Sequence, residues 1–189
     1  MGDYLGEVAG LLREVPQDTL RAISDRLWQA HCEDKQVFSC GNGGSNATAA
    51  HFIVDLVKGI DWPPGQRGFR AFSLADSTSA LTAYANDLGY EHIFSEPLRH
   101  LIGAGDVLLV LSGSGESKNV LRAMGVAREA GATVIALTGR DGGRARSLAD
   151  LCLLVPVESM QQIEDVHLAV AHALYLELKA RAERGGKSD

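Results

Sequence analysis

The chain has 189 residues, of which 46% are hydrophobic and 22% charged, and this balance predicts one folded domain with one core. The formal net charge is −6 and the basic residues are scattered, which argues against a nucleic-acid partner and favours a small ligand. No segment approaches the roughly 20 apolar residues of a membrane helix, and the N-terminus lacks a signal-peptide pattern. The three cysteines form no CxxC pair, so we expect reduced thiols and a cytoplasmic protein.

Two amphipathic helices are predicted in residues 1–33. Apolar side chains recur at helical spacing from Leu5 to Leu12 and again from Leu20 to Leu27. Together with an apolar closing helix, they carry more hydrophobic surface than one sheet of this size should cover. We therefore expect these helices to pack at contacts between subunits of an oligomer.

Five short apolar runs follow, each with the length of a buried strand. They are residues 36–40, 69–74, 106–112, 133–138 and 151–157. Helical patterns separate them at about 46–58, 77–86, 92–103, 117–130 and 143–149, and a closing helix is expected at about 161–183. Strands joined by helices predict a doubly wound α/β core over 36–183, with a parallel five-stranded sheet flanked by helices. The WPPG turn (62–65) and the GGKSD tail (185–189) are expected at the surface.

Two loops rich in glycine and serine follow predicted strands. The first, GNGGS (41–45), leads into a helix whose free N–H groups can hold an anion, although an ordinary tight turn has the same composition. The second, SGSGES (112–117), brings three hydroxyls to the carboxyl end of a strand, where open α/β sheets bind ligands. Neither loop continues as a nucleotide P-loop, so the pair indicates a phosphate monoester.

Several motifs occur in a fixed order between about residues 36 and 175. They are CGNGGS with AAHF, SALTAYANDLGYEHIFS, GDVLLVLSGSGESKNVLRA, VIALTGRDGG and VHLAVAHAL. This ordered series is far more specific than any single motif, and it resembles the phosphoheptose isomerases of the SIS (sugar isomerase) family. The resemblance implies a flavodoxin-like SIS domain spanning 1–189, a homotetramer, and an aldose–ketose isomerase acting on sedoheptulose 7-phosphate.

The resemblance also implies that the two loops cradle the phosphate of the sugar substrate. Carried over residue by residue, the substrate-binding positions are Asn42, Gly43, Gly44, Ser45, Ser112, Gly113, Ser114 and Ser117. Among them Asn42 is the expected sugar contact. The chain departs from the family at Gly113, where Thr is usual, and therefore lacks one hydroxyl.

A second polar set lies on two predicted helices. His51 and Asp55 stand four residues apart and share one helix face, and the family has a metal-binding His and a catalytic, metal-binding Glu at these positions. Glu164 and His172 fall where the family has a metal-ligating Gln and a catalytic His. The resemblance thus implies a divalent metal, with Zn²⁺ the expected ion, bound by His51, Asp55, Glu164 and His172. Asp55, His172 and Glu164 are the expected proton-transfer residues.

The spacing on the closing helix complicates this ligand set. Eight residues separate Glu164 from His172, which is about 12 Å of rise and roughly 80° of rotation, so both can bind one ion only by leaning inward. The resemblance implies active sites built at subunit contacts, so the two ligands need not come from one chain. His167, between them, is expected to be structural.

Two other functions stay open. The departures at Gly113, Asp55 and Glu164 lie near the reacting groups, so the substrate can be another long sugar phosphate, such as an octose phosphate of secondary metabolism. Some SIS proteins instead keep the fold as a binding or sensing module without chemistry. The complete set of histidines and carboxylates favours an enzyme.

Overall fold

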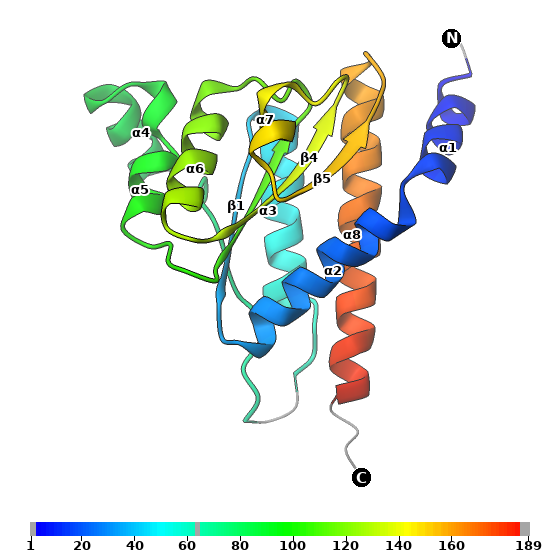
Figure 1. Ribbon diagram of the computed structural model, residues 1–189, viewed down its shortest axis with the longest axis horizontal. Helices are drawn as coiled ribbons and strands as arrows, with labels where there is room; N and C mark the ends of the chain where they lie inside the picture. Colours follow the sequence, from blue (N-terminus) through cyan, green and yellow to red (C-terminus); the bar gives the residue numbers. More distant parts are fainter. Residues whose placement is uncertain (1–2, 63–64, 186–189) are drawn as a thin grey trace.

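Five parallel strands form one sheet in the computed structural model, which describes residues 3–62 and 65–185 (Figure 1). The strands are β1 Gln36–Cys40, β2 Arg70–Ser73, β3 Val107–Ser112, β4 Thr133–Gly139 and β5 Leu151–Val155. They lie in the order β2-β1-β3-β4-β5, which is the flavodoxin-like order and confirms the predicted doubly wound fold. The turn at 62–65 and the C-terminal tail lie partly outside the described residues.

Helices cover both faces of the sheet. They are α1 Tyr4–Glu14, α2 Gln17–Cys32, α3 Gly43–Lys58, α4 Thr78–Asp87, α5 Ser95–Arg99, α6 Lys118–Glu129, α7 Gly143–Leu148 and α8 Met160–Gly185, with a 3₁₀ turn, η1, at Tyr90–His92. α2, α3 and α8 pack on one face, whereas α4 to α7 cover the other (Figure 1). No helix of the described part of the chain is long and apolar enough to cross a membrane.

The central strand, β3, shows why the strands of this sheet are continuous apolar runs in the sequence. In β3, Val107 and Leu109 belong to the core under α2, α3 and α8, while Leu108 and Val110 belong to the core under α4 to α7. A strand covered on both faces needs apolar residues at every position rather than at alternate ones. The same burial on both sides explains the continuous VLLVL sequence.

The predicted helix at 92–103 is wrong in extent. The segment forms η1 and the five-residue α5, and the N–H groups of His100 and Leu101 bond to carbonyls only three residues earlier. The Asp106 carboxylate then accepts the N–H groups of Gly103 and Gln36, both at 2.8 Å. These bonds turn the chain into β3, so the apolar residues of the segment reach the core without one continuous helix.

The N-terminal helical pair extends along the closing helix. α1 has no buried residue and contacts the start of α8 through polar bonds: Tyr4 Oη donates to Asp165 at 2.5 Å, and the Gln162 amide donates to Glu7 at 2.6 Å. The hydrogen bond to Asp165 raises the pKa of Tyr4 to about 12. Leu5 remains 79% exposed, so this chain alone does not cover the apolar side of α1.

Candidate active site

The two loops meet at the carboxyl edge of the sheet. β1 and β3 are direct neighbours, with Val37 opposite Val107 and Cys40 opposite Val110. The chain leaves β1 for α3 on one face of the sheet and leaves β3 for α6 on the other. A crevice therefore opens between the loops, at the place where open α/β sheets bind their ligands.

A cavity of about 290 Å³ occupies this crevice. All eight predicted substrate-binding positions line it: Asn42, Gly43, Gly44, Ser45, Ser112, Gly113, Ser114 and Ser117. Leu111 of β3 and two residues of α8, Met160 and Glu164, complete the lining. Among the described residues that line the cavity, Glu164 carries the only charge.

The second loop is shaped by its own hydroxyls. Ser112 Oγ accepts the Gly115 N–H at 3.2 Å, and Ser114 Oγ accepts a backbone N–H two residues on, also at 3.2 Å. Gly115 has a φ of +65°, and a Cβ there would overlap the carbonyl of Gly142, so only glycine fits. Ser117 begins α6 without a side-chain cap bond, so its hydroxyl stays available to a ligand.

Two glycines make room for residues of α8. A Cβ on Gly44 would overlap the carboxylate of Glu164, so this carboxylate lies against the first turn of α3. Similarly, a Cβ on Gly113 would overlap the thioether of Met160. The missing hydroxyl at Gly113 is thus accompanied by a methionine in the space that a side chain at 113 would need.

Asn42 lies between the cavity and a neighbouring hollow. Its carboxamide exchanges two hydrogen bonds with that of Asn119, at 2.9 and 3.0 Å, and its Oδ1 also accepts the Tyr90 hydroxyl at 2.8 Å. The hollow, of about 510 Å³, is lined by Asn42, Tyr90 and Asn119 among others, and shares Ser117 with the first cavity. The sequence reasoning missed Asn119 and Tyr90.

A group of possible metal ligands lies between α3 and α8. The ligand atoms of His51, Asp55 and His172 all lie within 4.8 Å of one another, and His51 Nε2 is 3.6 Å from Asp55 Oδ2. The His51 side chain is 48% exposed and that of Asp55 is 19% exposed, so solvent can reach the group. Within the described ranges, this is the one cluster of three or more such residues close enough to share an ion.

Glu164 is not part of that group in this chain. α3 and α8 pack against each other, and both begin at the carboxyl edge of the sheet (Figure 1). Glu164 lies level with Gly44 at the top of this helix pair. Seven residues, about 10 Å of helical rise, separate Gly44 from His51. The structure therefore brings three of the four predicted ligands together and leaves the fourth in the loop cavity.

His167, also on α8, faces the sheet. It is 1% exposed, and its Nε2 lies 3.2 Å from the carbonyl oxygen of Thr138. Burial lowers its pKa from 6.5 to about 4, because a charged imidazole would lose its hydration there. A neutral imidazole bonded to the end of β4 suits a packing role.

Comparison with known proteins defines the class. The family model for the SIS domain matches residues 3–139. A phosphoheptose isomerase of Laribacter hongkongensis (strain HLHK9) is 40% identical over 178 residues, which cover 92% of this chain and 90% of that protein. The chain therefore belongs to the SIS domain family and, within it, to the phosphoheptose isomerases. This membership makes it an enzyme of the sugar-phosphate isomerase class.

Solved structures agree with this assignment. A phosphoheptose isomerase from Neisseria gonorrhoeae superposes with a TM-score of 0.86 at 34% identity, and one from Francisella tularensis with 0.87 at 27%. In both comparisons 94% of this chain and 95% of the other chain are covered. The helical pair and the α/β core are thus shared over nearly the whole length.

Proposed function

We propose that the chain is an aldose–ketose isomerase that converts sedoheptulose 7-phosphate to a heptose 7-phosphate through an enediol, with a divalent metal. The observation that carries the proposal is the presence of two sites on one helix pair. A cavity of neutral anion donors lies at its top, and a His/Asp group lies about two turns below. The three relatives quoted above are all named phosphoheptose isomerases, which supports a seven-carbon substrate.

The cavity suits a phosphate group. The N-terminus of α3 offers N–H groups and a favourable dipole, and Ser112, Ser114 and Ser117 offer hydroxyl donors. Among the described residues, no lysine or arginine lines the cavity, so its hydrogen-bond donors are backbone N–H groups and short, neutral side chains. Such a site can position a phosphate monoester by many hydrogen bonds and still release it.

The distance between the two sites favours a long sugar. The rise from Gly44 to His51 is about 10 Å, so a phosphate at the loops and a carbonyl at the His/Asp group need an extended carbon chain between them. A heptose phosphate suits this separation better than a triose or tetrose phosphate. An octose phosphate fits the same argument, and direct assay must distinguish them.

The three clustered side chains fit a divalent ion. Two imidazoles and one carboxylate form a donor set typical of catalytic zinc, and their mutual spacing allows one ion to contact all three. When bound, the ion would polarise an oxygen of the sugar next to the reacting carbons. We propose Zn²⁺, because imidazole and carboxylate donors together suit it.

Proton transfer falls to side chains of the same group. The reaction removes a proton from the carbon beside the carbonyl and returns one to the neighbouring carbon. Asp55 and His172 are the proposed base and acid, since both approach the position of the ion from different helices. Glu164 would act as a fourth ligand or substitute base only through a turned side chain or in a site completed by another subunit.

Assembly is the second part of the proposal. Val54 and Val57 of α3 and Leu176 of α8 are 56%, 51% and 61% exposed, and they lie on the helices that hold the His/Asp group. Exposed apolar side chains around a site indicate a contact surface. We propose a homotetramer in which residues 1–33 and this helix pair meet other subunits, so that each active site is built at a contact.

The decisive experiment assays the purified protein against ketose phosphates of five to eight carbons, with metal content measured on the same sample. The proposal expects the highest kcat/KM with sedoheptulose 7-phosphate and loss of activity on chelation, restored by Zn²⁺. A clear preference for another length would replace the substrate. Binding without turnover of any of them, with metal bound, would favour a sensing module instead.

A further inference from the structure

Asn42 occupies a helix-capping position without capping the helix. It is the N-cap residue of α3, with φ −120° and ψ 148°, and asparagine at this position usually accepts an N–H of the first turn. The Asn42 side chain makes no such bond. In the same chain, the N-cap residues Asp3 and Ser77 do cap their helices, at 3.1 and 3.2 Å.

The Asn42 carboxamide does not cap α3 because it is hydrogen-bonded to two other residues. Asn42 Oδ1 accepts from Asn119 Nδ2 and from the Tyr90 hydroxyl, which fills both of its lone-pair positions. Asn42 Nδ2 donates in return to Asn119 Oδ1. Asn119 is 2% exposed and its Oδ1 also accepts the Val120 N–H, so it is itself fixed.

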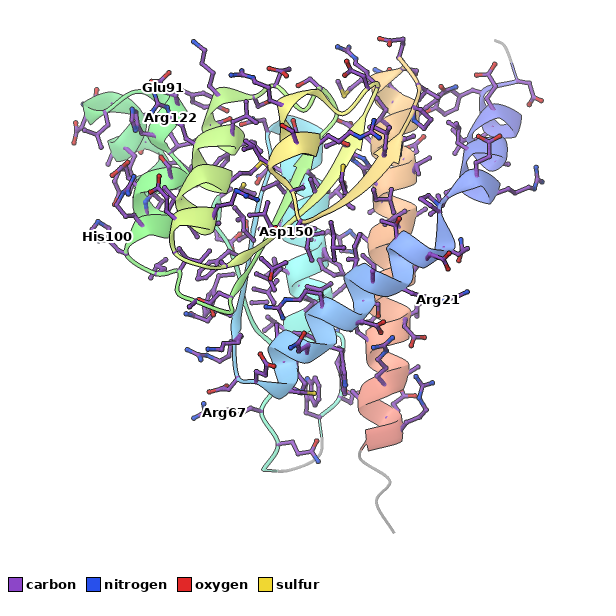
Figure 2. The ribbon with its side chains drawn as sticks, in the orientation of Figure 1. Arg21, Arg67, Glu91, His100, Arg122 and Asp150 are labelled. Atoms are coloured by element: carbon purple, nitrogen blue, oxygen red, sulfur yellow. The ribbon has the colours of Figure 1, made fainter. Side chains whose placement is uncertain are left out.

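Tyr90 is held in place by a second contact of the same turn. The next residue, Glu91, forms an ion pair with Arg122 in the first half of α6, and Figure 2 shows these two residues close together beside that helix. The pair ties η1 to α6 and keeps the Tyr90 hydroxyl near Asn42. Tyr90 itself is 62% exposed, so loss of its hydroxyl removes one bond without opening the core.

Release of the carboxamide would place it in competition with a ligand. The first-turn N–H groups of α3 border the loop cavity, and an anion there uses the same donors that an N-cap oxygen uses. A freed Asn42 would gain a cap bond and thereby stabilise the ligand-free protein. It would at the same time block the donors that the phosphate needs.

We propose that Tyr90 and Asn119 are positioning residues that hold Asn42 away from the helix, so that the N-terminus of α3 stays uncapped for the substrate phosphate. The inference rests on the phosphate-binding part of the proposed function. It makes one turn of the chain, η1, responsible for the affinity of a cavity that it does not line.

The test measures binding of inorganic phosphate by calorimetry, and the melting temperature without phosphate, for Tyr90→Phe, Asn42→Ala and the double variant. Tyr90→Phe should weaken phosphate binding about 3- to 10-fold, the size expected for one neutral hydrogen bond. Its melting temperature should stay equal or rise. In the Asn42→Ala background the same change should have no effect, because the competing side chain is gone. Tyr84→Phe, on α4 and outside these cavities, is the matched control.

Three results would overturn the inference. One is phosphate affinity unchanged by Tyr90→Phe, and another is an equal loss in the presence and absence of Asn42, which would mean that Tyr90 acts independently of it. The third is a wild-type protein that does not bind phosphate at all. The isomerase assay distinguishes failure of the inference from failure of the proposed function. A protein that binds phosphate in the predicted pattern but isomerises no sugar would support the inference and contradict the proposed function.

Discussion

Substitution of Glu164 by glutamine tests where this side chain acts. The Glu164 carboxylate lies against Gly44 inside a cavity of about 290 Å³, so a phosphate held there would come within about 5 Å of it. At that distance, an effective dielectric constant between about 20 and 80 gives about 1–3 kcal/mol of repulsion for each unit of phosphate charge. Glu164→Gln should therefore tighten phosphate binding by about 10-fold or more.

The assay is calorimetric titration with inorganic phosphate, with metal content measured on the same preparations. Asp165→Asn is the matched control. It removes the same charge from the adjacent residue, whose side chain bonds to Tyr4 instead of facing the cavity. Unchanged phosphate affinity in Glu164→Gln would refute the reasoning. Loss of bound metal in that variant, with phosphate affinity unaltered, would instead place Glu164 among the ligands, as the family resemblance implies.

Three other regions give measurable predictions. Ser114→Ala should weaken phosphate binding by about 1–3 kcal/mol and lower the melting temperature only slightly, because the Glu116 N–H that loses its partner is exposed to water; calorimetry and a thermal melt check the two together. Gly113→Thr should destabilise the protein by no more than about 1 kcal/mol, because the Met160 thioether that it meets is partly exposed and can turn away, and adding Met160→Ala should remove that cost in chemical denaturation. Because burial lowers the His167 pKa from 6.5 to about 4, the unfolded chain takes up this proton first as the pH falls. Stability should be full above pH 6.5 and drop by about 3 kcal/mol towards pH 4, a loss absent in His167→Gln when unfolding is measured across that range.

The strands could be predicted well because the sheet is covered on both sides. The three central strands β1, β3 and β4 reach both cores, as Leu108 and Leu109 do in β3, whereas the edge strand β2 alternates exposed and buried positions. The helix expected at 92–103 failed for a local reason. Phe94 and Leu98 have helical spacing, but the turn before β3 is set by the bonds of Asp106, which periodicity does not report.

The loop cavity could be located because both loops follow strands and the carboxyl ends of parallel strands share one edge. The residues that hold Asn42 in place beside the cavity could not be predicted. Tyr90 and Asn119 lie 48 and 77 positions from Asn42, and their bonds depend on how α6 and η1 are placed over the sheet. The one local signal is Asn42 itself, an ideal capping residue at a helix start to which the family resemblance gives a role in substrate binding.

The eight-residue interval between Glu164 and His172 has a simple meaning on a pair of helices that run in the same direction. Gly44 and His51 stand seven residues apart on α3, so each of them has a partner on α8 at nearly the same height. Helical rise then fixes the separation of the two levels at about 10–12 Å, whatever the side chains do. A phosphate bound at the upper level leaves the reacting carbons of a sugar at a depth set by its chain length. In such a site, discrimination between sugars follows from which carbons reach His51, Asp55 and His172, and the affinity of the loops for phosphate serves every chain length equally.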